Sequence, residues 1–195
     1  MEQLALDPRT TALVIIDLQR GIVARPTAPH GAAQVVDQAR RLAERCRETA
    51  ATVVLVRVAY AADGRDRLGQ PVDAAPWSAA VGPDWSEIVP ELGPKPGDLV
   101  VTKRQWGAFY GTELDLLLRR RGVRTIVLGG ISTNFGVEST ARDAWERGYE
   151  LVFAEDAMAA MASEAHQFAV TQIFPRLGRV RSTADIVAAL APAAR

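Results

Sequence analysis

The sequence of 195 residues contains a single cysteine and only two histidines. One cysteine excludes an intramolecular disulfide framework and fits a reducing compartment, so we expect a cytoplasmic protein. No apolar run approaches the ~20 residues of a membrane span, and we expect no signal peptide because the first residues lack a basic region followed by a long apolar stretch. Lys plus Arg equals Asp plus Glu, at 23 each, which predicts neither nucleic acid nor an anionic membrane as a partner.

Motifs for nucleotide cofactors and for serine nucleophiles are also missing. The sequence has no G-x-G-x-x-G and no phosphate-binding loop, so no cofactor is expected. It has no G-x-S-x-G turn, the usual setting of a serine nucleophile in α/β-hydrolases. What remains is an ordinary globular composition, 48% hydrophobic and 24% charged. Its length suits one domain spanning residues 1–195.

Short apolar runs rich in β-branched residues alternate with amphipathic stretches along the chain. The runs predict strands at residues 11–17, 52–60, 98–103, 123–130, 150–157 and 177–182. Helical periodicity predicts helices at residues 31–50, 111–122, 133–148, 162–174 and 183–191. Continuous apolar strands alternating with helices favour a three-layer α/β/α, Rossmann-like fold with a mostly parallel sheet of about six strands.

One segment, residues 61–97, departs from this alternation. It holds six prolines and five glycines, together with Trp77 and Trp85. A long ordered loop in a compact domain is usually functional or an interface. The alternative is a surface excursion without a role.

Polar residues follow several predicted strands. Asp17 ends the first strand, Lys103 ends "LVVTK", and the glycine-containing turn 129–134 follows "TIVL". In an open parallel sheet, ligands bind outside the carboxyl ends of the strands. We therefore expect a carboxylate, an ammonium and a tight turn to converge on one edge of the sheet. Helix capping or solvation would explain any one of these residues alone.

Three stretches carry a family resemblance: "ALVIIDLQRGIV", "VTKRQWGAFYGTEL" and "GGISTNFGVESTARDAWERGY". They resemble the signature blocks of the isochorismatase-like hydrolases, also called the cysteine hydrolase family, in the family's order and spacing over residues 8–190. The resemblance implies the isochorismatase-like α/β fold, a catalytic aspartate at Asp17 and a catalytic lysine at Lys103. The family's nucleophilic cysteine falls on Gly136, so the chain is similar to a subgroup with glycine at that place.

The same resemblance implies a backbone feature in the third block. The family has a non-proline cis peptide that maps onto Ile131–Ser132. This bond is expected to turn the N–H groups of Ser132 and Gly136 toward the substrate, which makes Ile131 and Ser132 candidate substrate-binding residues.

No other residue is an obvious replacement for the missing nucleophile. Cys46 lies on the apolar face of the predicted helix 31–50, which favours a core position. Serine or threonine chemistry near Gly136 needs a base such as histidine, and His30 and His166 lie in no signature block. Metal-binding amidases of the family use an Asp/His cluster after the second strand. Here that stretch offers Asp63 and Asp66 without histidine, so no metal is expected.

True isochorismatases also carry glycine at this position, and their chemistry needs no covalent intermediate. The resemblance therefore implies hydrolysis of a small vinyl ether or related carboxylate, with Asp17 as general acid and Lys103 as its partner. Trp106 is expected either to line the pocket or to form a core or subunit contact. Arg104 is expected either to clamp a substrate carboxylate or to make a surface salt bridge.

Two other functions stay open at this point. The third block reads "GISTNFG", in the style of the cysteine subgroup and unlike the isochorismatase pattern G-V-Y-A-H-x-G. The chain is therefore also compatible with a catalytically silent small-molecule binding protein, or with an amidase that uses a different nucleophile. Because family members commonly associate, we expect a homodimer or a higher homo-oligomer.

Overall fold

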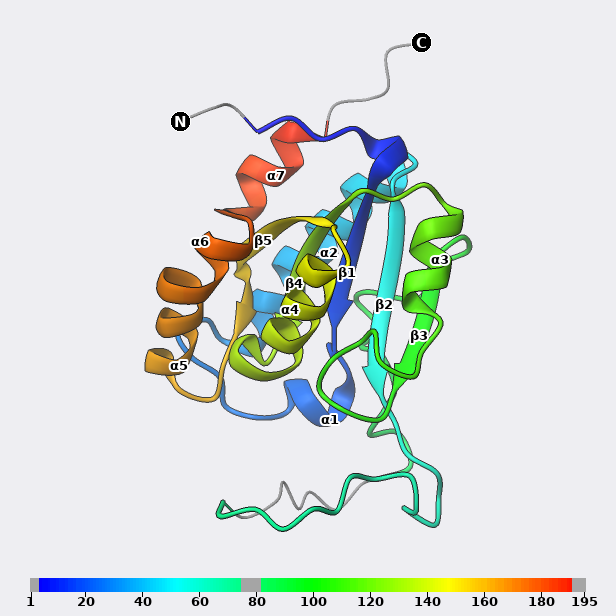
Figure 1. Cartoon of the computed structure of the whole chain (residues 1–195), viewed down its shortest axis with the longest axis vertical. Helices are drawn as coiled ribbons and strands as arrows, with labels where there is room; N and C mark the ends of the chain where they lie inside the picture. The colour runs from blue at the N-terminus through cyan, green and yellow to red at the C-terminus, as the bar shows by residue number, and fades with distance from the viewer. Residues whose placement is uncertain (1–3, 75–81, 191–195) are drawn as a thin grey trace.

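The computed structural model describes residues 4–74 and 82–190, so Pro76 and Trp77 lie outside the described residues. Within this part, six strands form one parallel sheet in the order β3-β2-β1-β4-β5-β6 (Figure 1). The strands are β1 Thr11–Ile16, β2 Thr52–Val58, β3 Leu99–Lys103, β4 Thr125–Ile131, β5 Glu150–Ala159 and β6 Arg179–Arg181. The predicted fold class is therefore confirmed, with the sheet parallel throughout.

Helices cover both faces of the sheet. They are α1 Arg20–Val23, α2 Ala32–Glu48, α3 Leu114–Arg120, α4 Glu138–Glu146, α5 Ser163–Phe168, α6 Phe174–Leu177 and α7 Thr183–Ala189, with short turns η1 Pro8–Thr10, η2 Thr133–Val137 and η3 Ala169–Ile173. Side chains of β1 alternate between the faces, as the two-residue strand period requires. Leu13 and Ile15 pack in the cluster formed with α2 and α7, whereas Val14 and Ile16 pack in the cluster formed with α3, α4 and α6.

Two predicted helices are less regular than the sequence suggested. The helix predicted over 133–148 begins with the π-helical turn η2, in which the Val137 amide donates to the Ser132 carbonyl. The helix predicted over 162–174 divides into α5, η3 and α6. Pro175, in the first turn of α6, has no N–H and its ring displaces the carbonyl four residues earlier, which explains a wider π turn before it.

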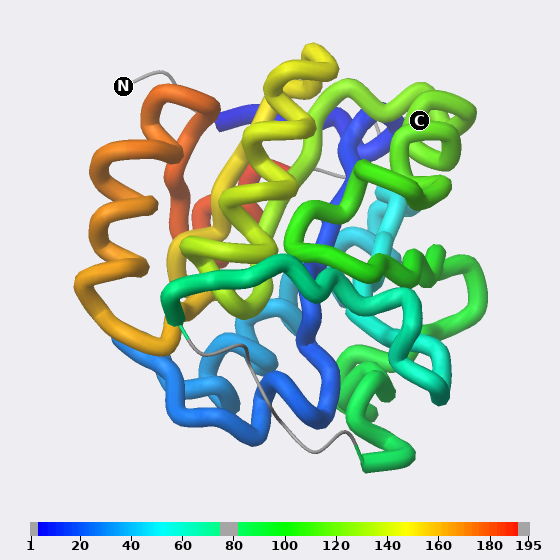
Figure 2. Tube along the Cα trace, turned by 60° about the horizontal axis from the view of Figure 1, so that its bottom comes forward, coloured from blue at the N-terminus to red at the C-terminus, as the bar shows by residue number. Residues whose placement is uncertain are grey.

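The irregular segment after β2 is anchored at defined points. Figures 1 and 2 show its described part extending past the carboxyl ends of the strands and running across that edge. The buried Gln19 side chain donates to the carbonyls of Val58 and Trp85 at 3.0 and 3.2 Å. At its far end, Asp98 accepts from the Arg47 guanidinium of α2 at 2.6 Å. Among the described helices, none is long and apolar enough to cross a membrane.

Candidate functional site

The strand order places the site where parallel sheets bind ligands. β1 and β4 are neighbours, and the chain runs outward from them in opposite directions, which creates a switch point at their carboxyl ends. Asp17 follows β1 directly, and the turn η2 follows β4. Asp17 has a left-handed backbone with φ of 54°. Non-glycine residues rarely adopt this conformation, and when they do they concentrate at functional positions.

Asp17 and Lys103 form a buried ion pair. Lys103 is the last residue of β3, and its side chain reaches past β2 to the end of β1. There Lys103 Nζ donates to Asp17 Oδ2 at 2.7 Å and to the Gln105 carbonyl at 3.0 Å. The side chains are 2% and 8% exposed. The predicted convergence of these two residues is confirmed.

The environment of Asp17 shifts the pKa of its carboxyl group upward. Burial raises the pKa of Asp17 above its ordinary value, while the Lys103 ammonium and, more weakly, the Val58 amide oppose part of that rise. The carboxyl group thus has one oxygen, Oδ2, held by Lys103 and a second, buried oxygen, Oδ1, that makes no hydrogen bond of good geometry to the described residues.

The turn after β4 lies directly beside this pair. The Ile131–Ser132 peptide bond is cis, as predicted. A Cβ atom built on Gly136 would lie 3.2 Å from Asp17 Oδ2, 2.9 Å from Ile16 Cγ2 and 3.6 Å from the Trp106 carbonyl. Gly136 therefore brings backbone against the carboxyl group at a point where any side chain would be crowded. That the N–H groups of Ser132 and Gly136 face a substrate stays a prediction.

Hydroxyl groups of this turn are engaged elsewhere. The Ser132 hydroxyl donates to Asn134 Oδ1 at 2.7 Å. Thr133 Oγ1 lies 2.9 Å from His166 Nδ1. His166 lies outside the three signature blocks in sequence, but the packing of α5 brings it against this turn. Thr133 and His166 are both fully buried, which closes this pair to a substrate.

The residues that follow Lys103 differ in burial and in the partners of their side chains. Phe109 is buried in the core. Trp106 is 63% exposed and packs on Phe135 with ring centroids 4.8 Å apart, so it is not a core residue. Arg104 Nε donates to Asp66 Oδ2 at 2.6 Å, which is the surface salt bridge and not a free clamp.

Two residues near the site were not singled out from the sequence. Gln19 lies two positions after Asp17. Its side chain hydrogen-bonds to Val58 at the end of β2 and to Trp85 of the irregular segment, and so holds this segment against the carboxyl end of the sheet. Tyr60 lies close enough to Asp17 for the carboxylate charge to raise its pKa, in addition to the larger effect of burial. The Tyr60 ring stacks on Trp85 with centroids 6.4 Å apart.

Two carboxylates of β5, Glu155 and Asp156, have structural partners. Asp156 Oδ1 accepts from the backbone N–H and the hydroxyl of Thr183 at 2.7 and 2.8 Å, which caps α7. Glu155 Oε1 lies 2.9 Å from His30 Nε2 and 3.1 Å from His166 Nε2. These three side chains are a group that could hold a metal ion. Cys46 is buried in the core, as predicted, and burial raises the pKa of its thiol to about 12.

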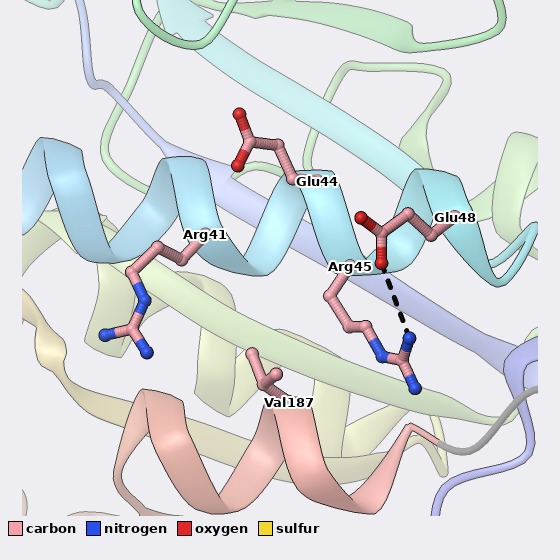
Figure 3. A pocket seen from close by; sticks show the side chains of 5 residues that line it. All are labelled: Arg41, Glu44, Arg45, Glu48 and Val187. Carbon is pink, nitrogen blue, oxygen red and sulfur yellow. Dashed lines mark hydrogen bonds and ion pairs between the residues drawn. The ribbon is translucent and has the colours of Figure 1, made fainter.

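A groove between α2 and α7 lies at the opposite, amino-terminal edge of the sheet (Figure 3). It is lined by Arg41, Glu44, Arg45, Glu48 and Val187. Arg45 and Glu48 of this lining form an ion pair at 3.4 Å, and Glu44 pairs with Arg40 outside it. No catalytic group of the kind described above lines it, so it is not the candidate active site.

Comparison with known proteins gives a consistent match over most of the chain. The family model for the isochorismatase domain matches residues 11–185. The isochorismatase family protein YecD of Escherichia coli O157:H7 is 51% identical over 187 residues, covering 96% of this chain and all of the relative. An isochorismatase family protein structure from Burkholderia thailandensis superposes with a TM-score of 0.92 at 48% identity, covering 97% of this chain and 99% of that one. The ureidoacrylate amidohydrolase RutB of Caulobacter vibrioides (strain ATCC 19089 / CIP 103742 / CB 15) is 31% identical over 210 residues, covering 94% and 92%.

Proposed function

The chain belongs to the isochorismatase family of hydrolases, and we propose that it hydrolyses a small vinyl ether or related carboxylate without a covalent intermediate. The observation that carries this proposal is the Asp17–Lys103 pair lying directly against Gly136. The groups that meet here are the Asp17 carboxyl group, the Lys103 ammonium and the backbone of Gly136, and none of them is a thiol. A carboxyl group and an ammonium can support a reaction that depends on proton transfer.

Asp17 acts as the general acid in this proposal. Its Oδ1 carries the proton, because Oδ2 is held by Lys103. The proton passes to the terminal methylene carbon of the vinyl ether, the π electron pair forms the new C–H bond, and the ether oxygen stabilises the resulting oxocarbenium ion. Water adds to the cationic carbon and returns a proton to the Asp17 carboxylate. The hemiketal then collapses to a keto acid and an alcohol.

Lys103 and Gly136 support this chemistry in different ways. The Lys103 ammonium fixes the orientation of the Asp17 carboxyl group and stabilises its anion after proton transfer. Gly136 lets the backbone of the turn approach Asp17, since a Cβ there would lie 3.2 Å from Oδ2 and 2.9 Å from Ile16 Cγ2. Trp106, exposed and packed on Phe135, is proposed as an apolar wall. Arg104 contributes a carboxylate clamp only if it leaves Asp66.

A second candidate is hydrolysis of a small amide. It is favoured by the relative named as a ureidoacrylate amidohydrolase. In this chain such a reaction would need direct attack by water, because Cys46 is buried in the core and Thr133 is sealed against His166. The vinyl ether reaction fits better, because it asks for a carboxylic acid and no nucleophilic side chain.

A substrate screen tests both candidates. Isochorismate, other enol-pyruvyl ethers and small amides are incubated with the protein, and keto acid or ammonia release is measured. We expect keto acid release that Asp17→Asn reduces by ~10²–10⁴-fold, while the exposed control Asp63→Asn leaves it unchanged. Ammonia release alone would favour the amide reaction. Binding in a thermal-shift assay without any turnover would refute catalysis and favour a binding protein.

A further inference from the structure

Both histidines of the chain meet at a place that the proposed reaction does not use. His30 comes from the loop before α2, Glu155 from β5 and His166 from α5. An antiparallel bridge between Ala28 and Ala160 holds that loop against the end of β5. The two imidazole Nε2 atoms and the Glu155 carboxylate oxygen all lie within 4.8 Å of one another.

We propose that His30, Glu155 and His166 bind a divalent first-row transition-metal cation, with Zn²⁺ as the reference ion. Imidazole nitrogen and carboxylate oxygen are ligands that such cations prefer. Two ligands ~2.1 Å from one metal lie ~3.4 Å apart in the tetrahedral arrangement that Zn²⁺ prefers and ~3.0 Å apart at right angles. Glu155 Oε1 lies 2.9 and 3.1 Å from the two Nε2 atoms, which are hydrogen-bond contacts close to the shorter of these spacings, so an ion would replace the imidazole protons that lie between them.

The second nitrogen of each imidazole also has a partner, as metal-binding histidines require. His166 Nδ1 lies 2.9 Å from the Thr133 hydroxyl, which can donate or accept. His30 Nδ1 lies 3.4 Å from Gln34 Nε2, which only donates, so the Gln34 amide must turn its oxygen toward this nitrogen when a cation binds. When a cation occupies the Nε2 atoms, the imidazole proton moves to Nδ1, and the Thr133 hydroxyl turns to accept it. The contact persists with donor and acceptor exchanged.

Access and charge suit an ion that arrives from solvent. The side chains of His30 and Glu155 are 20% and 31% exposed, whereas His166 is fully buried. The cluster is thus exposed to solvent at His30 and Glu155 and buried at His166. One carboxylate with two neutral imidazoles gives a net negative site, and water can fill the remaining coordination positions.

The order Thr133, His166, Glu155 also resembles a nucleophile, base and acid. Thr133 and His166 are fully buried, so no substrate reaches the hydroxyl. The open end of the cluster is at His30 and Glu155 instead, which is where an ion would enter. A metal site therefore gives a role to His30, Glu155 and His166, whereas a catalytic triad leaves His30 without one. The proposed metal site does not depend on the proposed reaction at Asp17.

Calorimetry with tag-free protein measures the binding directly. Titration with Zn²⁺ is expected to give one ion per chain, and Co²⁺ should give a visible absorption band that Zn²⁺ displaces. His30→Gln and Glu155→Gln should each weaken Zn²⁺ binding by at least ~10-fold, the lower range for a change in the surroundings of a metal. Glu164→Gln removes the same charge at an exposed position of α5 and should leave the affinity unchanged. Binding that survives His30→Gln unaltered would overturn the assignment, as would the absence of any Zn²⁺ binding.

Nuclear magnetic resonance on the unmodified protein keeps the proposal testable if a variant fails to fold. With two histidines in the chain, only two imidazole spin systems exist. Zn²⁺ is expected to shift both and to convert His166 from the Nε2–H to the Nδ1–H tautomer. Signals that stay unchanged at saturating Zn²⁺ would refute the site, whatever the outcome of the activity screen.

Discussion

Gly136→Cys tests whether this position lies where a nucleophile could act. The new Cβ would meet Ile16 Cγ2 at 2.9 Å, closer than side chains tolerate, and Asp17 Oδ2 at 3.2 Å. Ile16 is fully buried on β1, so relief must come from small shifts in the strand or the turn. Overpacking of this kind typically costs about 1–3 kcal/mol. For a chain of this size that corresponds to a fall in Tm of roughly 2–12 °C.

Gly136→Ala is the matched control, because it adds the same Cβ without a thiol. We expect the two variants to lose similar stability in thermal unfolding. Only Gly136→Cys should react with iodoacetamide in the folded state. The background is low, since Cys46 is fully buried and burial raises the pKa of its thiol to about 12. The new thiol would lie beside the Lys103 ammonium, which favours the thiolate, with Asp17 able to accept its proton.

The readout is the rate of alkylation by mass spectrometry from pH 6 to 9, followed by a screen for amidase and esterase activity. A folded Gly136→Cys protein that resists alkylation would refute the assignment of this position to the nucleophile. Stability unchanged in both variants would show that the close contact with Ile16 is absent in solution.

Three further outcomes are expected. Asp17→Asn should reduce keto acid release by the ~10²–10⁴-fold typical of a lost general acid, whereas thiol reagents should leave the rate of the unmodified protein intact. Lys103→Met removes a cation that lowers the pKa of Asp17, so the pH at which kcat/KM falls should increase. Lys103→Arg keeps the positive charge and should leave that pH nearly unchanged. A shift of the fall in kcat/KM to lower pH in Lys103→Met would contradict this reasoning. Asp98→Ala leaves the partly buried Arg47 guanidinium without its carboxylate partner. It should lower the free energy of unfolding, measured with denaturant, by about 3 kcal/mol. The exposed control Asp37→Ala should change this free energy by no more than about 0.5 kcal/mol.

Sequence patterns predicted the sheet and the Asp17–Lys103 pair because both follow from local signals and one rule of topology. Apolar runs mark the strands, and parallel strands bring their carboxyl ends together. The cluster of His30, Glu155 and His166 follows from no such rule. Its members lie in a loop, in a strand interior and on a helix, and tertiary packing brings them together: α5 packs against the turn η2, and the loop before α2 is held against the end of β5. The break in the helix predicted over 162–174 was foreseeable from Pro175, whereas the π turn at η2 depends on how the chain leaves β4.

The reach of Lys103 past β2 has a consequence for how the protein folds. The two members of the pair are 86 residues apart in sequence, and the glycine beside them comes later still. Local folding of the first half cannot assemble this edge, because β4 must insert next to β1 before the turn at Gly136 meets the carboxyl group. Contacts of such long range are slow to form. During synthesis, Gly136 would therefore meet the Asp17–Lys103 pair only after β4 has left the ribosome and paired with β1.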